Sequence, residues 1–115
     1  MSDPDIRFAG DSLIVGDSTY TMQHPIDAAF PLGTLVILLF APDSLRDHFG
    51  QFPNLIAIDA SSGEKVWEAE LPSTTTGDRY YKIASREPLV AYSVKSFVCT
   101  IDPSTGRITE KEFVK

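Results

Sequence analysis

The side chains of this sequence that could act together chemically are gathered in residues 42–50. This segment contains Asp43, Asp47 and His48 within six positions. Carboxylates and imidazoles bind divalent metal ions, and they also donate or accept protons in acid–base catalysis. Taken alone, the cluster therefore suggests a metal site or an acid–base pair.

One turn of helix explains the same segment without any chemistry. Asp43 suits the N-cap position, and Gly50 suits the end of the turn. Leu45 and Phe49 would then share one face. The second histidine of the chain, His24, lies in a separate loop. We favour the helical turn, and we expect no catalytic residue, no metal site and no cofactor.

Other signatures of enzymes are missing from the sequence. It contains no Ser-His-Asp ordering, no glycine-rich phosphate loop, no zinc-ligand spacing and no nucleotide-binding fingerprint. The single cysteine, Cys99, lies in the apolar run 97–101, where a buried and inert thiol is expected. We therefore expect that the chain is not an enzyme.

The cysteine content and the first residues predict the compartment. One cysteine cannot form an internal disulfide, as is usual for proteins of a reducing compartment. The first residues have neither the basic start nor the apolar segment of a signal peptide. The longest apolar run, residues 34–41, is shorter than the about 20 residues that a membrane-spanning helix needs. We expect a cytoplasmic protein that does not bind membranes.

Composition limits the kinds of partner. The chain has 115 residues, of which 43% are hydrophobic, and this favours one packed domain. Its formal net charge is −6 and its sequence pI is about 4.7. Nucleic acids and anionic membranes require a basic face, so neither is expected as a partner. A basic protein would be a compatible partner, and the same acidity would also serve solubility alone.

An internal repeat predicts the architecture. Residues 58–68 are echoed 43 positions later by residues 101–111. Each copy is an apolar strand, an Asp-x-Ser-Ser/Thr-Gly turn and a second, alternating strand. A period near 43 residues is typical of one blade of a β-propeller. A closed propeller has four blades or more, and this chain has room for fewer than three.

The repeated turn has a mechanical explanation. Asp59 and Asp102 can accept hydrogen bonds from backbone N–H groups across the turn. Gly63 and Gly106 can supply the positive φ that closes it. We therefore predict that these residues shape a hairpin and carry no chemistry.

Short apolar runs bounded by turn residues predict an all-β chain of antiparallel four-stranded meanders. The expected strands are 6–9, 13–15, 19–22, 26–30, 34–40, 54–59, 65–71, 79–85, 89–94, 97–102 and 107–114. The runs 34–40 and 89–94 are apolar on both faces, as in middle strands. The fold predicted is an open partial β-propeller of about two and a half blades in a single domain. Its parts are a partial blade at 6–22, blade one at 26–71 with a loop insertion at 41–53, and blade two at 80–114.

The first copy of the repeat resembles the blade signature of quinoprotein-type (PQQ-like) propellers. Residues 55–67 show that signature's apolar-Ala-apolar-Asp strand, its glycine turn and its Trp, with Ser62 where Thr is usual. In the second copy, Thr100 replaces the Ala and Thr109 replaces the Trp. The resemblance implies the fold alone, because the quinone-dependent activity of that family needs a closed ring and a metal–cofactor site.

By size, charge and build, the chain is also similar to half-propeller immunity proteins of contact-dependent toxin systems. Those proteins are short, acidic, cytoplasmic bacterial proteins that block a cognate toxin, often a basic nuclease. This similarity implies a protein-interaction module, an immunity or inhibitor protein that occludes a basic partner. The alternative is a structural or assembly module that self-associates through its open blade flank, for example as a homodimer.

Loop placement predicts where a partner binds. In a four-stranded meander, the connections 41–53 and 72–78 emerge at the same end, and long loops on a rigid scaffold usually carry recognition. Phe49 and Phe52 suit the role of anchors, or they fold back onto the sheet. The predicted partner-binding residues are Asp43, Arg46, Asp47, His48, Phe49, Gln51, Phe52, Asp78 and Arg79.

Overall fold

Alternating apolar and polar residues between glycine turns give this chain short strands. A computed structural model describes residues 5–42, 53–73 and 78–114. In these ranges the strands are β1 (Ile6–Ala9), β2 (Ser12–Val15), β3 (Ser18–Thr21), β4 (Ile26–Leu32), β5 (Leu35–Phe40), β6 (Leu55–Asp59), β7 (Lys65–Glu68), β8 (Tyr80–Ser85), β9 (Leu89–Ser93), β10 (Phe97–Ile101) and β11 (Ile108–Phe113). No helix of the described residues is both long and apolar enough to cross a bilayer.

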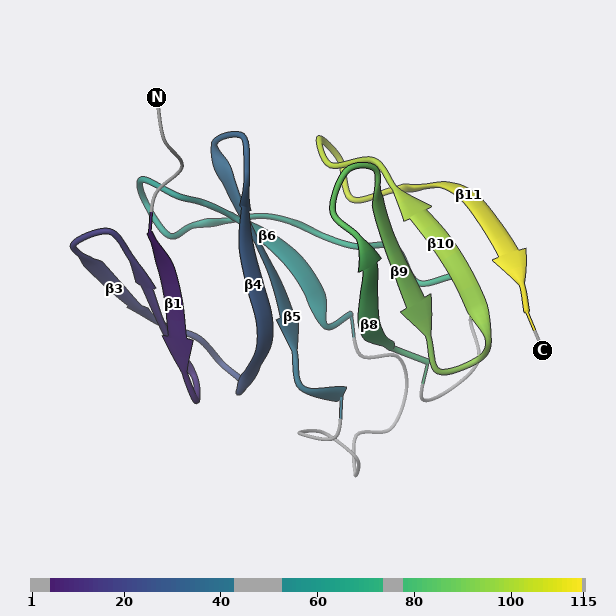
Figure 1. The fold of residues 1–115 in the computed structure, drawn as a ribbon, viewed down its shortest axis with the longest axis horizontal. Coiled ribbons are helices and arrows are strands. Elements are labelled where there is room, and N and C mark those ends of the chain that lie inside the picture. The colour runs from purple at the N-terminus through teal and green to yellow at the C-terminus, as the bar shows by residue number, and fades with distance from the viewer. Residues whose placement is uncertain (1–4, 43–52, 74–77, 115) are drawn as a thin grey trace.

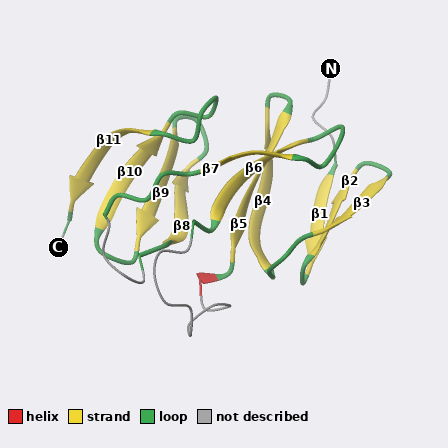
Figure 2. Ribbon diagram, turned by 180° about the vertical axis from the view of Figure 1, so that it is seen from behind, coloured by secondary structure: helices red, strands yellow, loops and turns green. Residues whose placement is uncertain are grey.

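The strands form three antiparallel sheets, each a meander of consecutive strands (Figure 1). We call them sheet I (β1–β3), sheet II (β4–β7) and sheet III (β8–β11). The three sheets follow one another along the length of the molecule, as the view from behind also shows (Figure 2). The predicted fold class, an open partial β-propeller of antiparallel meanders, is confirmed.

Sheet II is buried on both faces. Its Val36, Leu38 and Ile58 pack with Leu13 and Val15 of sheet I in one apolar core. The residues of its other face pack against sheet III in a second core, whose members include Ile37, Leu55, Trp67, Tyr80, Leu89 and Cys99. This double burial explains why β5 is apolar at every position.

The end of one predicted strand needs correction. The strand expected at 65–71 ends at Glu68, because the backbone N–H of Glu70 donates to the carbonyl of Gly106 in sheet III. The apolar run 89–94 forms a middle strand as predicted, and Val90 and Tyr92 on one face of β9 are half-buried. The reason is that no described residues pack over this face of sheet III as sheet III packs over sheet II.

The repeated turns are built as predicted. The Oδ1 atom of Asp59 accepts from the backbone N–H of Ser61 at 2.7 Å, and Asp102 accepts from Ser104 in the same way at 2.9 Å. The hydroxyl groups of Ser61 and Ser104 also donate to these carboxylates, and the side-chain and backbone hydrogen bonds together lower the pKa of both carboxyl groups below the usual value of 3.8. Gly63 and Gly106 have φ angles of 77° and 79°.

Each repeated turn also packs against an aromatic ring of the preceding sheet. A Cβ atom at Gly63 would lie 2.5 Å from the ring of Tyr20, and one at Gly106 would lie 2.6 Å from the ring of Trp67. Tyr20 therefore has in sheet I the position that Trp67 has in sheet II. The absence of a side chain at both glycines lets neighbouring sheets approach closely.

Candidate protein-binding site

The described ends of the two long connections lie at one end of the molecule, the lower end in Figure 1. The backbone N–H of Ala41 donates to the carbonyl of Pro25 at 2.9 Å, and that of Val94 donates to Arg79 at the same distance. The connections after β3 and β5 are therefore neighbours, and so are the connections after β7 and β9, as the meander pattern predicts. We call this region the loop end.

The base of the loop end is held by Asn54, which sequence reasoning missed. Its side chain is fully buried. Its amide nitrogen donates to the carbonyls of Phe40 at 3.0 Å and Tyr80 at 2.6 Å, and its Oδ1 accepts from the N–H of Tyr80 at 2.8 Å. One amide thus joins sheet II to sheet III. The available signal was a polar residue at the start of the expected strand 54–59.

Asp78 and Arg79, both predicted to contact a partner, are buried at this base. Their exposed fractions are 0% and 8%. Asp78 accepts hydrogen bonds from the Oγ of Ser73 at 2.8 Å and from the N–H of Arg79 at 3.0 Å. The guanidinium of Arg79 donates to the carbonyl of Pro42. Both side chains therefore fasten the two long connections to the scaffold.

The other predicted partner-binding residues lie outside the described part of the chain. They are Asp43, Arg46, Asp47, His48, Phe49, Gln51 and Phe52. The helical turn expected within 42–50 falls in the same segment. Their role in binding stays a prediction.

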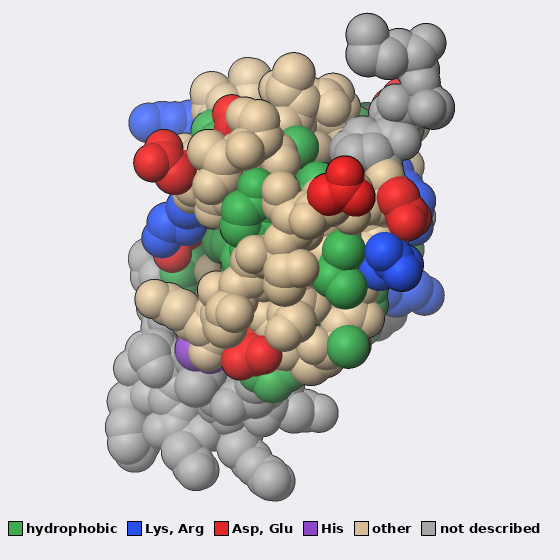
Figure 3. Space-filling model, turned by 90° about the vertical axis from the view of Figure 1, so that its left-hand side faces the viewer, with side chains coloured by type: hydrophobic (Ala, Val, Ile, Leu, Met, Phe, Trp, Pro, Cys, Tyr) green, Lys and Arg blue, Asp and Glu red, His purple; other side chains and the backbone are tan. Residues whose placement is uncertain are grey.

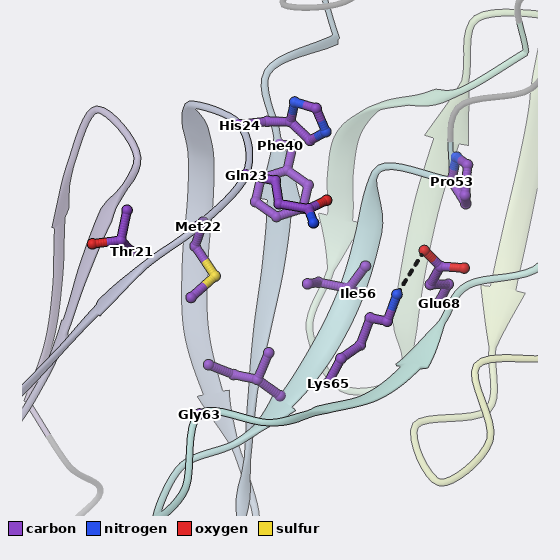
Figure 4. Close-up of a pocket in the computed structure, with 11 residues that line it drawn as sticks. Thr21, Met22, Gln23, His24, Phe40, Pro53, Ile56, Gly63, Lys65 and Glu68 are labelled. Atoms are coloured by element: carbon purple, nitrogen blue, oxygen red, sulfur yellow. Dashed lines mark hydrogen bonds and ion pairs between the residues drawn. The ribbon is translucent and has the colours of Figure 1, made fainter.

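A pocket of about 340 Å³ opens beside the loop end, between sheet I and sheet II (Figure 4). It is lined by Thr21, Met22, Gln23, His24, Phe40, Pro53, Ile56, Ile58, Gly63, Lys65 and Glu68. In Figure 4, Thr21 and Met22 stand on one side of the pocket and Lys65 and Glu68 on the other, with Ile56 between them. We call it the inter-sheet pocket.

The inter-sheet pocket combines an apolar floor with a polar rim. Phe40 and Ile56 are 6% exposed, and Ile58 is 1% exposed. The ring of His24 meets Phe40 edge-on, with 5.4 Å between the ring centroids. Such a lining suits an apolar side chain, or a small amphipathic group whose polar atoms would lie at the rim.

An ion pair crosses one side of the rim. The Nζ of Lys65 lies 3.0 Å from the Oε2 of Glu68, and these side chains are 53% and 46% exposed. Exposed pairs of this kind contribute little to stability, so a charged group of a ligand could exchange partners with them. No sequence pattern showed the pocket, because its walls come from separate sheets.

Two further ionisable groups, those of Cys99 and Tyr80, lie in the core between sheets II and III. Cys99 is fully buried, as expected, and burial raises the pKa of its thiol. Burial likewise raises the pKa of the Tyr80 phenol, which donates to the carbonyl of Glu70 at 2.5 Å. Among the described residues, no group of three or more His, Cys, Asp or Glu side chains is placed to hold a metal ion.

Comparison with known proteins agrees with this geometry. The sheets and turns define the class, an open part of a β-propeller. BamB from Moraxella catarrhalis has a similar structure, with a TM-score of 0.57 and 17% identity over 100% of this chain and 34% of that chain. This chain thus spans about a third of that protein's length, and the likeness concerns the fold alone.

The family follows from the sequence. Residues 3–113 match the domain of unknown function DUF7957, so the chain belongs to this family. The computationally designed Ika8 protein has a TM-score of 0.44 and 10% identity, over 93% of this chain and 48% of that chain. No curated protein matches the chain.

Proposed function

We propose that the chain is a non-enzymatic protein-interaction module of the bacterial cytoplasm that occludes a basic partner. In this proposal it is an immunity or inhibitor protein, and the partner is a toxin such as a nuclease. The loop end and the adjoining inter-sheet pocket form the binding surface.

The observation that carries the proposal is the pocket beside the loop end. Protein interfaces gain most of their binding energy from a few apolar anchors that fill well-packed pockets inside a polar rim. The floor of Phe40, Ile56 and Ile58, with Gln23 and Glu68 at the rim, has this composition. The hydrogen bonds of Asn54 and Asp78 hold the neighbouring connections on a rigid base, so a partner would meet a preorganised surface.

Charge supports a basic partner. The chain carries a formal net charge of −6, which attracts a basic protein over a distance and speeds association. This attraction is screened by salt, so the affinity for a basic partner should fall as ionic strength rises.

The test is direct binding to a purified candidate toxin, with the product of the neighbouring gene as the first choice. Gln23 is exposed at the pocket rim, and Gln23→Trp would fill the pocket mouth without entering the core. Thr19→Trp is the matched control, because Thr19 is an exposed residue of β3 that does not line the pocket. The wild-type chain and the control should bind and inhibit the toxin, and Gln23→Trp should bind about tenfold more weakly.

Two results would overturn the proposal. One is a candidate toxin that no form of the chain binds or inhibits. The other is an affinity that neither salt nor Gln23→Trp changes. That result would show that neither the acidic surface nor the pocket belongs to the interface.

A further inference from the structure

The outward face of sheet III carries an ordered pattern of charge. Because residues paired across antiparallel strands share a face, the strand register defines rows of side chains. One row runs Lys82, Tyr92, Val98 and Glu112 across β8, β9, β10 and β11. A second row runs Val90, Thr100 and Glu110. The face is therefore basic at β8, apolar in the middle and acidic at β11.

The side chains of this face are accessible. Lys82, Glu110 and Glu112 are exposed, whereas Val90, Tyr92, Val98 and Thr100 are half-buried. Tyr81, which is 45% exposed, widens the apolar centre, since its ring centroid lies 6.2 Å from that of Tyr92. The Nζ of Lys82 lies 6.0 Å from the centroid of the Tyr92 ring, on the same face.

The corresponding face of sheet II shows what a face looks like when another sheet covers it. There the row across the four strands is Phe30, Ile37, Ala57 and Trp67, and sheet III buries all of these residues. On sheet III, the outer strand β11 has Glu110 and Glu112 in place of such apolar residues. Burying these carboxylates without partners would be costly, so the occupant of this face must bring basic groups to β11.

We propose that the occupant is the same face of a second copy of the chain. A two-fold axis parallel to the strands places β8 of each copy opposite β11 of the other. Lys82 of each copy then lies opposite Glu112 of the other, and the apolar centres meet. A two-fold interface must be complementary to itself, and a row with a cation at one end and an anion at the other meets this requirement.

The opposite flank of the molecule lacks this pattern. On sheet I the outward rows are Arg7, Ile14 and Thr19, and Ala9, Ser12 and Thr21. Arg7 is the one charged residue of these two rows, and it already pairs with Asp5 at 3.3 Å. Figure 3 shows this flank, where apolar side chains are scattered among polar side chains and backbone. The proposal therefore concerns sheet III alone, and it does not involve the inter-sheet pocket.

Sedimentation velocity of the full chain over a concentration series tests the proposal. The mass should rise from the 12.7 kDa of one chain toward twice that value, and it should rise less at high salt. Lys82→Glu and Glu112→Lys should each weaken self-association about tenfold or more, because like charges would face each other. The double variant should recover most of the loss, because every Lys–Glu contact is restored with its charges exchanged.

Arg107→Glu is the control for charge reversal, since Arg107 is exposed beyond the turn between β10 and β11 and lies outside both rows. It should leave self-association unchanged. A wild-type chain that stays at the mass of one chain throughout the series would overturn the proposal. So would a double variant that associates as weakly as the two single variants, with circular dichroism showing that all are folded.

Discussion

The indole Nε1 of Trp67 donates a hydrogen bond to the carbonyl oxygen of Pro103, with 2.9 Å between the two atoms. The two residues belong to different sheets, and the ring also lies against Gly106 of the same turn. Trp67 is 7% exposed. The repeated turn is thus more than a hairpin, because each copy receives an aromatic side chain from the sheet before it.

Truncation of this tryptophan should be costly. Trp67→Ala removes a large buried ring from the core between sheets II and III, and we expect a loss of about 3–5 kcal/mol in the free energy of unfolding. Urea unfolding followed by circular dichroism measures the loss. Val66→Ala is the control, since Val66 is 49% exposed on the same strand and should change stability little. A near-neutral Trp67→Ala would show that the ring does not join the sheets.

A second prediction compares two glycines with positive φ. Gly33 has a φ of 63°, and the place that a Cβ atom would take there is open space, whereas at Gly106 a Cβ would lie 2.6 Å from the Trp67 ring. Gly33→Ala should cost about 1–2 kcal/mol, from backbone strain alone. Gly106→Ala should cost clearly more in the same unfolding assay. Equal losses would mean that the ring can move aside.

A third prediction concerns Asn54. Asn54→Ala removes the side-chain amide that bonds the N–H of Tyr80 and the carbonyl of Phe40, and both of these hydrogen bonds are buried. Each buried polar group left unpaired costs about 1–3 kcal/mol, so a loss of about 2–6 kcal/mol is expected for these two groups. Hydrogen exchange at the Tyr80 amide should also become faster. Unchanged exchange at that amide would contradict the bridging role of Asn54.

The repeated turns predict a pH dependence. Hydrogen bonds from Ser61 and Ser104 hold the pKa values of Asp59 and Asp102 below 3.8 in the folded state. Their contribution to stability is therefore present above pH 3.8 and is lost as the pH falls through the folded-state pKa values. Unfolding of the double variant Asp59→Asn/Asp102→Asn should change less over this acidic range than unfolding of the wild type. An identical slope in both proteins would contradict the assignment.

Local patterns predicted most of the fold because each strand and turn is specified by adjacent residues. The apolar runs and glycine turns gave all the strands among the described residues, and the Asp59 and Gly63 geometry followed from one turn motif. The early end of β7 depends on a contact between sheets. The strand ends at Glu68 because the backbone N–H of Glu70 donates to the carbonyl of Gly106.

The candidate site was predicted less completely for the same reason. Its place at the loop end followed from the order of strands in a meander. Asn54, Asp78 and Arg79 at its base form hydrogen bonds with residues that lie 5 to 37 positions away in the sequence. A short sequence pattern does not show such partners. The inter-sheet pocket needs Thr21 of sheet I and Glu68 of sheet II on its two walls.

The most direct test of the proposed function is the affinity of the loop end for its partner. Replacing residues 42–52 with a two-residue turn should leave the scaffold folded, since Lys95-Ser96 makes the equivalent connection between β9 and β10. Calorimetric titration against the candidate toxin should then show a loss of about 2 kcal/mol, or roughly thirtyfold in Kd. A folded, shortened chain that binds the toxin as tightly as the wild type would contradict the claim that the loop end recognises the partner.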